Sequence, residues 1–570
     1  MSSPRTRLTL ASVAVAFAAA DTYVVVLALP DMMAGVGLSA DQLQRAAPII
    51  SGFLLGYIAV LPLIGRIADV VGRTPVLVGA LTLFAVGSLI TAGAYDLSLI
   101  VVGRFLQGVG GGGLVPATLA LVADLWPAER RGLPLGVVGA VQEIGSVLGP
   151  LLGAAVLAVA DWRYIFWLNL AVAVVLALFL RGLQRPPLSA AVGLLACIAL
   201  GLTLTAPERL ASGITLGLPF VPFSGDSRLL TPIGVASLVL LLLWLALILF
   251  KTRASLADLV KKVDLVGALL LALALSGVVL AFATADPERE VMAPAGPWLL
   301  VAAAVFAVAF AAWQRRTAQA IVPPGLLGAR PAWGSLLVSF LVGAALIAAL
   351  VDVPVFARTT QSGGQLAAAL VLLRFLVALP IGAVVGGWLT RRYGLGLITG
   401  AGLTLAGAMF VLMAFWDKDA LKHAPATISL LACGFGFGLA LSPVNTAILG
   451  ATRPDSHGLV SALVVVARMV GMLVGVSALT AIGLRRYYTL VADIPSPNEL
   501  CPDNAASCRP FVDALRGAGI SQVHTIFAGA AVCAFAAAVL AVLLLGRRPA
   551  TATVSTGDGG HGDGESARVR

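Results

Sequence analysis

The stretch GRIADVVGR, residues Gly65–Arg73, lies between two long apolar segments near the start of the chain. These segments, 47–65 and 75–94, each have about the 20 apolar residues that a helix needs to cross a lipid bilayer. The stretch between them carries two arginines and an aspartate. We therefore predict two membrane helices that are joined by a short polar turn.

The residue types in this turn suit a specific geometry. Gly65 and Gly72 permit a close helix approach and a tight turn. Asp69 can lie at the N-terminus of a neighbouring helix, where the helix dipole favours an anion, and Arg73 can pair with a carboxylate. The alternative is an ordinary basic turn with no special role.

The composition of the whole chain supports a membrane protein. The 570 residues are 59% hydrophobic and only 11% charged, whereas a soluble domain carries roughly 25% charged residues. So few charges could not cover the surface of a soluble enzyme or nucleic-acid-binding protein, and both classes are excluded. We assign the net charge of +10 to cytoplasmic loops, where membrane proteins concentrate lysine and arginine.

About sixteen stretches are long and apolar enough for membrane helices, so we predict an all-α integral membrane fold. Their approximate ranges are 8–29, 47–65, 75–94, 97–122, 132–158, 164–181, 188–206, 229–250, 264–284, 297–313, 332–352, 366–390, 395–415, 427–450, 457–484 and 521–546.

The placement of lysine and arginine predicts the orientation. Basic clusters such as Arg130-Arg131 and Arg391-Arg392 alternate with acidic residues such as Asp161 in loops on the other side. Because basic loops stay in the cytoplasm, we predict an even number of spans with both termini cytoplasmic. The first apolar run mimics a secretory signal, but it continues to Leu29, which favours an uncleaved first span.

Two six-helix halves with pseudo-symmetry flank a group of inserted helices. The predicted parts are an N-terminal half (1–185), linker helices (186–330), a C-terminal half (331–548) and a disordered cytoplasmic tail (549–570). A weak echo of the Gly65–Arg73 turn at Gly386–Gly394 supports the repeat. Repeated halves place a substrate path at their interface near the middle of the membrane. The linker helices contain few polar residues, so we expect them to face lipid.

The fourth span carries Arg104, Gln107 and a run of glycines from Gly108 to Gly113. A charge inside a span costs about 2.5–3.5 kcal/mol on insertion scales, so it usually faces a partner or a cavity. For Arg104 the alternative is to snorkel to the outer edge of the membrane. The glycines permit near backbone-to-backbone packing of helices.

The fifth span repeats this glycine pattern. Gly145, Gly149 and Gly153 recur at four-residue spacing and predict a flat helix face, while Pro150 predicts a bend.

Three charged residues fall at similar depth in separate spans. Asp21, Glu143 and Arg468 lie roughly 20, 18 and 16 Å from the cytoplasmic side, at 1.5 Å per helical residue. A carboxylate that gains and loses an arginine partner as the halves rock would change its affinity for protons. With Arg104, these residues form our candidate proton-coupling set. A static buried ion pair between the halves is the alternative.

Few other residues predict chemistry. Cys501 and Cys508 share one outer loop, where a disulfide and a pair of free thiols are both compatible with an oxidising periplasm. His457 and His524 lie near span ends, where we expect surface positions. The chain has no phosphate-binding G-x-x-x-x-G-K-[ST] motif and no His/Cys cluster with metal-ligand spacing, so we expect no cofactor, metal or nucleic acid.

Several of these motifs together resemble the major facilitator superfamily, in its fourteen-spanner drug:proton antiporter branch. The resembling segments are Asp21-Thr22 with Ala28-Leu29-Pro30, Gly65–Arg73, Arg104 with Gln107-Gly108, Gly145–Gly153 and Asp161-Trp162-Arg163. A closer similarity, through nearly the whole chain except 188–250 and the tail, is to the mycobacterial triacylglyceride exporters. It rests on Asp21–Val26, Gln142–Pro150, Val263–Gly267, Ala378–Val384, His457-Gly458 and Val464–Met469.

This resemblance implies a major facilitator fold and export of cell-envelope lipid from a bacterial inner membrane. It also implies a link to drug tolerance, functional roles for Asp21, Glu143 and Arg468, and a periplasmic lipid-carrier lipoprotein as partner. The chain departs from the family in its extra pair of spans at 188–250. Its loop at Trp416–Pro425 is also short for the outer extension expected there, which puts docking of the lipoprotein in doubt.

Three functions fit these observations. The leading hypothesis is a proton-driven exporter of apolar or amphiphilic substrates, with lipid first. The second is a multidrug:proton antiporter for small cationic or amphiphilic compounds, and the third is a membrane scaffold that transports nothing. The position of Asp21, Glu143 and Arg468 relative to the cavity between the halves discriminates among them.

Overall fold

A computed structural model of the chain describes residues 4–38, 43–127, 130–181, 188–212, 215, 217–224, 227–251, 264–283, 292–317, 320–323, 325–361, 364–501 and 508–546. Over these residues it is all-helical, and sixteen of its helices have 18 residues or more. Each coincides with one predicted span, so the predicted fold class is confirmed. By length and composition, twelve described helices can cross a membrane, and Ser189–Thr205 and Pro232–Leu247 are shorter apolar helices.

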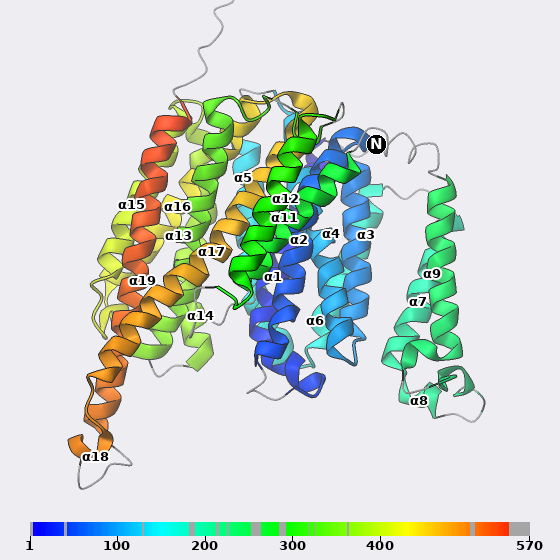
Figure 1. The fold of residues 1–570 in the computed structure, drawn as a ribbon, viewed down its shortest axis with the longest axis horizontal. Helices are drawn as coiled ribbons and strands as arrows, with labels where there is room; N and C mark the ends of the chain where they lie inside the picture. The colour runs from blue at the N-terminus through cyan, green and yellow to red at the C-terminus, as the bar shows by residue number, and fades with distance from the viewer. Residues whose placement is uncertain are drawn as a thin grey trace, which may run out of the picture.

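The N-terminal half consists of six helices that pack around α4 and α1 (Figure 1). They are α1 (Pro4–Gly35), α2 (Leu43–Val71), α3 (Arg73–Ala92), α4 (Leu97–Leu125), α5 (Gly132–Leu157) and α6 (Arg163–Arg181). Local sequence sets two of their ends. Asp96 caps α4 by accepting a hydrogen bond from the Leu99 N–H at 2.8 Å. Gly72 divides α2 from α3 at a φ of 103°, which other residues rarely adopt.

The C-terminal half repeats this arrangement. Its helices are α13 (Arg330–Thr360), α14 (Gly364–Leu389), α15 (Leu395–Met413), α16 (Ala424–Gly450), α17 (His457–Ala492) and α19 (Arg509–Leu544). The pairs α1–α5, α2–α4, α3–α4 and α3–α6 of the first half correspond to α13–α17, α14–α16, α15–α16 and α15–α19 of the second. The same order of packing in both halves is the pseudo-symmetry that the echo at Gly386–Gly394 indicated.

The two halves meet closely at the end of the bundle that holds Asp69, here called the Asp69 end. There α2 packs on α17, and α5 packs on α14 and α16. A methyl group at Gly65 would lie within 2.6 Å of the Gly458 carbonyl oxygen, so α2 and α17 touch through their backbones. The Ser442 hydroxyl donates a hydrogen bond of 2.8 Å to the Gly132 carbonyl, which joins α16 to α5 at the same end.

The linker helices α11 (Leu265–Ala283) and α12 (Gly296–Gln314) pair with each other, and α11 packs on both α2 and α17. The expectation that the linkers only face lipid is therefore wrong for α11. A buried polar cluster holds the end of this hairpin, because Asp264 accepts hydrogen bonds of 2.8 Å from the Trp313 indole and 2.7 Å from the Gln314 amide. The linker thus bridges the seam between the halves.

The extra pair, α7 (Leu188–Thr205) and α9 (Pro232–Lys251), stands beside the bundle with short helices at its tip (Figure 1). Near that tip the Leu204 side chain lies against Gly93, and the Arg228 guanidinium lies 4.9 Å from the centre of the Tyr95 ring. Residues such as Leu194 and Leu242 are more than 60% exposed, so this pair presents a large apolar surface, which is compatible with the predicted position in lipid.

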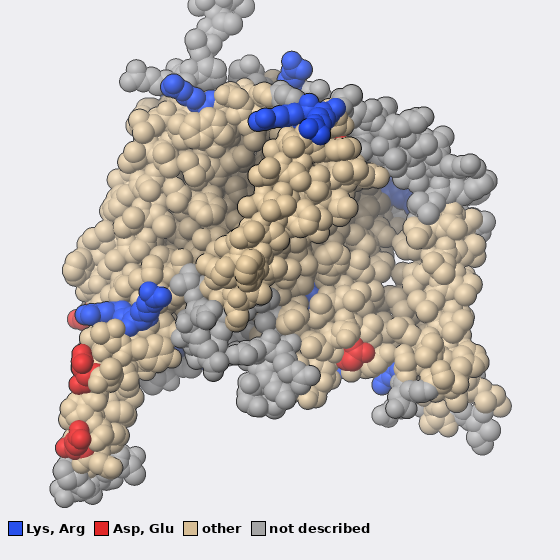
Figure 2. Space-filling model, viewed as in Figure 1, with Lys and Arg blue, Asp and Glu red and all other residues tan. Residues whose placement is uncertain are grey.

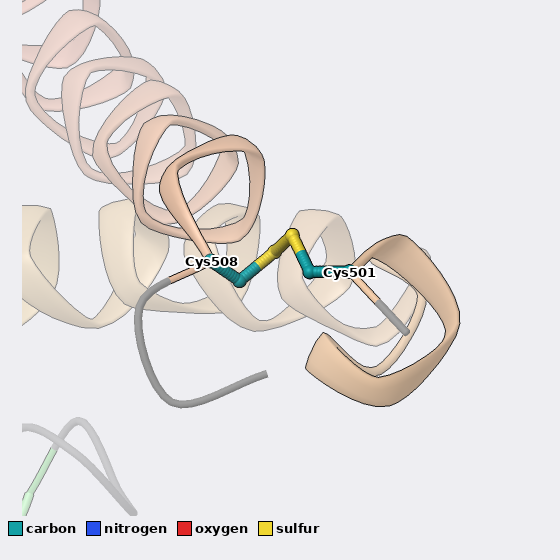
Figure 3. Close-up of a disulfide and its surroundings, with 2 residues drawn as sticks. All are labelled: Cys501 and Cys508. Atoms are coloured by element: carbon teal, nitrogen blue, oxygen red, sulfur yellow. A yellow bond between two sulfur atoms is a disulfide. The ribbon is translucent and has the colours of Figure 1, made fainter. Parts of the chain in front are cut away.

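The helices α17 and α19 have 36 residues each, which is roughly 54 Å at 1.5 Å per residue and well beyond a bilayer core of about 30 Å. Their far ends project from the bundle together with α18 (Pro497–Leu500) (Figure 1). Cys501 and Cys508 are joined there by a disulfide, with their Cα atoms 5.7 Å apart (Figure 3). The chain therefore has a projecting extension between α17 and α19, although its loop at Trp416–Pro425 is short.

Charged side chains lie mainly near the two ends of the bundle. On the face in Figure 2, basic residues lie toward both ends, whereas the acidic residues lie toward the lower end. The start of α1 and the end of α19 lie at the same upper end in Figure 1, as an even number of spans requires. The tail 549–570 lies outside the described residues.

Candidate functional site

A cavity lies between the two halves. It is lined by α4 and α5 from the N-terminal half and by α13, α16 and α17 from the C-terminal half. Apolar residues such as Val115 and Val444 form most of its wall, and the polar groups include Gln142, Asn445 and Arg468. An apolar wall with a few polar groups is typical of a site for an amphiphilic molecule.

A second cavity adjoins the first and shares Val115, Gln142 and Arg468 with it. Thr22 and Tyr57 from α1 and α2 line it, together with Met469 and Met472 from α17. Methionine side chains are flexible and polarisable, and they adapt to ligands of irregular shape. Among the described residues that line the two cavities, Arg468 is the charged one, and it lies on both.

Asp21 forms a buried ion pair within the N-terminal half. Its carboxylate accepts a hydrogen bond of 2.6 Å from Arg104 Nη1 on α4 and a second from the Asn169 amide on α6. Asp21 and Arg104 are each 1% exposed. Arg104 does not snorkel to the membrane edge, because its charge is neutralised by Asp21 inside the helix bundle.

A polar network extends this pair toward α3. Arg104 Nη1 also donates to Gln107 Oε1 at 3.0 Å, and the Gln107 amide donates to the Ser88 hydroxyl at 2.9 Å. The Arg104 guanidinium lies 4.3 Å from the centre of the Phe53 ring, which is a cation–π distance. The network fixes the orientation of Arg104 from three helices, so Asp21 has a preorganised partner.

The structure separates two residues that the depth estimates grouped together. Asp21 pairs with Arg104 and Asn169, whereas Arg468 faces the cavity between the halves. Asp21 and Arg468 therefore form no described contact with each other in this conformation. The physical reason is rotational, because successive helix residues point about 100° apart. Thr22 faces the cavity, and its neighbour Asp21 points into the N-terminal half.

The fifth span, α5, packs closely through the flat face that its glycines predicted. Methyl groups at Gly145 and Gly149 would collide with the carbonyl oxygens of Ala16 and Ala20, so α5 crosses α1 in backbone contact. Gly153 is buried as well. The side chains of Glu143 and Pro150 lie outside the described residues, but Gln142 and Ser146 on either side of Glu143 line the second cavity.

The glycine run of α4 contacts two neighbouring helices. Methyl groups at Gly108 and Gly112 would collide with backbone oxygens of Phe53 and Tyr57 on α2, and one at Gly110 would lie within 2.5 Å of the Phe84 nitrogen on α3. This close packing of α4 brings Arg104 and Gln107 within reach of three other helices.

Asp69 joins the two halves at the Asp69 end. Its carboxylate accepts hydrogen bonds from the backbone N–H groups of Gly458 at 2.8 Å and Leu459 at 3.1 Å, in the first turn of α17. This is the helix N-terminus at which the sequence placed an anion. Asp69 also pairs with Arg73, whose Nε donates to Asp124 on α4 at 3.2 Å. The turn thus links α2, α4 and α17.

His457 begins α17 beside this contact. The expectation of a surface position is wrong, because His457 is 1% exposed and its Nε2 lies 3.1 Å from the Leu449 carbonyl oxygen. His524 is half-buried, with Nε2 2.7 Å from the Trp416 carbonyl oxygen.

Sequence reasoning missed Asn169, Ser88 and Asn445. Each is a polar residue inside an apolar span, and that was the available signal, because polar groups inside a membrane need partners. Asn169 pairs with Asp21 on α1 and Ser88 with Gln107 on α4, so periodicity within one helix could not identify these contacts.

Comparison with known proteins agrees with this geometry. The family model described as Major Facilitator Superfamily matches residues 11–476. The triacylglyceride transporter of Mycolicibacterium smegmatis is 36% identical over 555 residues, which cover 94% of this chain and 86% of the relative. That of Mycobacterium tuberculosis is 36% identical over 562 residues, which cover 95% of both chains.

Two solved structures share the fold. The human organic anion transporter MFSD10 superposes with a TM-score of 0.54 at 14% identity, over 94% of this chain and all of that one. The proton:xylose symporter XylE superposes with a TM-score of 0.53 at 14% identity, over 95% of this chain and 96% of that one. The relatives and the fold are those of transporters and not of enzymes. The chain is therefore a multi-pass membrane protein that belongs to the major facilitator superfamily.

Proposed function

We propose that this protein is a proton-driven exporter of cell-envelope lipid, with a triacylglyceride-like substrate, from a bacterial inner membrane. The observation that carries the proposal is the cavity between the halves, whose wall is mostly apolar and whose polar groups are few. An apolar wall suits acyl chains, and the Gln142, Asn445 and Arg468 side chains suit ester or headgroup oxygens. The relatives named as triacylglyceride transporters support the same substrate class.

The described lining of the cavities favours lipid over the second candidate, an antiporter for small cationic drugs. A site for a cation is expected to supply a carboxylate, and none is present among the described residues that line either cavity. A non-transporting scaffold is also disfavoured, because its centre should be closed by apolar side chains.

We place the Asp69 end in the cytoplasm, with both termini on that side, because the basic clusters Arg130-Arg131 and Arg391-Arg392 lie in loops next to it. The halves are joined at this end by Asp69 and Ser442, so the conformation described here corresponds to one that is closed to the cytoplasm. Release of the Asp69 contact would let the halves rock and open the cavity to the cytoplasmic side.

Proton coupling in this proposal uses Asp21, Arg104, Glu143 and Arg468. Protonation of Asp21 would remove the charge that Arg104 neutralises, and the buried guanidinium would then favour a different arrangement of α4. Glu143 is the second carboxylate, on the helix whose Gln142 and Ser146 line the cavity. The projecting end of α17 and α19 is where we would seek contact with a periplasmic lipid carrier.

The test uses the full chain in liposomes that contain a fluorescent triacylglyceride, with a pH gradient across the membrane. We expect Asp21→Asn and Glu143→Gln each to reduce gradient-driven export by about tenfold or more, because each removes a group that must gain and lose a proton. Asp419→Asn is the matched control, since this carboxylate is exposed and pairs only with Lys422 among the described residues. A parallel assay with a cationic dye separates lipid export from drug export.

Gradient-driven export that is undiminished in both variants would exclude the coupling scheme. Export of the dye without export of the lipid would favour the drug antiporter.

A further inference from the structure

A second carboxylate is buried in the C-terminal half, and its surroundings differ from those of Asp21. Asp352 on α13 is 5% exposed, yet no described residue forms a hydrogen bond or ion pair with it. Asp21 is also buried, at 1% exposed, but it is held by Arg104 and Asn169. The two buried carboxyl groups therefore differ in whether they have a described partner.

The helix α13 places Asp352 between the cavity and the far end of the bundle. Gly343, nine residues earlier, packs against the Arg468 carbonyl on α17, so Asp352 lies roughly 13 Å farther along the helix. Phe356, one turn later, packs on Trp416 at 5.4 Å and on His524 at 6.4 Å between ring centres. Residues four apart share a helix face, so Asp352 points into the C-terminal half beneath this aromatic group.

The charged and titratable groups on the neighbouring helices form no described hydrogen bond or ion pair with Asp352, and Arg485 and Arg486 on α17 are exposed. On α19, His524 Nε2 lies on the Trp416 carbonyl. On α14, Arg374 donates a hydrogen bond of 2.8 Å to the Thr427 hydroxyl of α16. On α17, Arg468 lines the cavity between the halves. None of these cations forms a described ion pair with Asp352, so a negative charge at this position would have no described counter-charge.

An unpaired carboxylate in a low-dielectric interior is costly, and such a group takes up a proton and becomes a neutral acid. The same group can release that proton to water when a conformational change admits water or brings a cation near it. Intramembrane carboxyl groups that alternate in this way serve as proton carriers in pumps and transporters.

We propose that Asp352 is a proton-carrying site of the transport cycle, in the C-terminal half and separate from the Asp21–Arg104 pair. In the conformation described here it holds one proton as a carboxylic acid. When the halves rearrange, it releases this proton to water on the cytoplasmic side and becomes a carboxylate. It then takes up one proton again when the cavity reopens to the outside. This inference rests on the proposed proton-driven export, and it adds a second site to it.

Infrared difference spectra of the purified full chain between acidic and alkaline buffers test the protonation state directly. We expect the carbonyl band of a buried protonated carboxyl group in the natural sequence and in Asp21→Asn, and its loss in Asp352→Asn. Asp352→Glu should keep the band at a shifted position. Asp419→Asn is the control for an exposed carboxylate, and thermal melting in detergent monitors folding of every variant.

Export assays on the same variants test the role of the site. We expect Asp352→Asn to reduce the stimulation of triacylglyceride export by a pH gradient by about tenfold, and Asp352→Glu to restore most of it. The inference is overturned if the infrared band persists in Asp352→Asn, or if this variant keeps the full stimulation. If the natural sequence itself shows no stimulation by the gradient, the proposed function fails, and the infrared band still decides whether Asp352 holds a proton.

Discussion

The two halves of the molecule repeat one pattern of helix contacts, but different kinds of side-chain interaction stabilise the interior of each half. The N-terminal half buries ion pairs and a polar network, namely Asp21–Arg104 with Gln107, and Asp69–Arg73. The C-terminal half buries a chain of aromatic rings, Phe375, Phe437, Phe410, Phe527 and Trp416, with neighbouring ring centres about 6 Å apart. Its described ion pairs, Asp419–Lys422 and Asp513–Arg516, are exposed.

This difference shows that pseudo-symmetry of the backbone does not extend to the interior. Backbone packing depends on small residues at helix crossings, and both halves have them. The interactions inside each half depend on side chains away from the helix crossings, and these side chains can differ between the halves without changing the backbone packing. We therefore expect changes at the crossings to affect both halves alike, and changes in the interior to affect them differently.

The largest effect should follow a change at a helix crossing. A side chain at Gly145 would collide with the Ala16 carbonyl on α1, and one at Gly471 would collide with the Phe340 carbonyl on α13. These are equivalent crossings of the two halves. We expect Gly145→Leu and Gly471→Leu both to prevent accumulation of folded protein, with a cost of about 3 kcal/mol or more each. Fluorescence-detected size-exclusion chromatography measures this.

Gly79→Ala is the control for both glycine variants, because a methyl group at this helical position meets no atom within 4 Å. Normal folding of either leucine variant would mean that the two halves do not share the same backbone constraint.

The next effect should follow loss of the cation in the N-terminal half. Arg104→Gln leaves the buried Asp21 carboxylate without its counter-charge, which costs about 3–5 kcal/mol. Thermal melting at several pH values measures this loss, which should be smaller at acidic pH, because protonation then neutralises Asp21. The double variant Asp21→Asn/Arg104→Gln should recover much of the stability. Equal losses in the single and double variants would contradict a coupled pair.

A smaller effect should follow a change in the aromatic interior of the C-terminal half. Phe437→Leu removes edge-to-face contacts with Phe375 at 6.2 Å and Phe410 at 5.9 Å between ring centres. We expect a loss of about 1–2 kcal/mol that does not change with pH, because no charge is involved. Melting curves across the same pH range as for Arg104→Gln measure it. A stability loss in Phe437→Leu that depends strongly on pH would mean that charged groups also stabilise the interior of the C-terminal half.

Much of the architecture could be predicted from the sequence because it depends on local chain properties. The length and apolar character of the spans predicted the sixteen long helices of the described residues, since a helix satisfies its backbone hydrogen bonds within one segment. The Gly65–Arg73 turn predicted a carboxylate at a helix N-terminus, because few residue types can fill a short turn between spans. Residues such as Gly145 were assigned to close crossings for the same local reason.

The tertiary structure alone decided which partners meet. Depth along a helix follows from residue number, so Asp21, Glu143 and Arg468 could be placed at one level. The direction of each side chain around its helix depends on how neighbouring helices rotate and pack. That rotation turned Asp21 toward Arg104 and Asn169, left Arg468 on the cavity and buried Asp352 with no partner among the described residues. The position of a charged residue along its own helix determines its depth in the membrane, but the packing of the whole bundle determines its interaction partners.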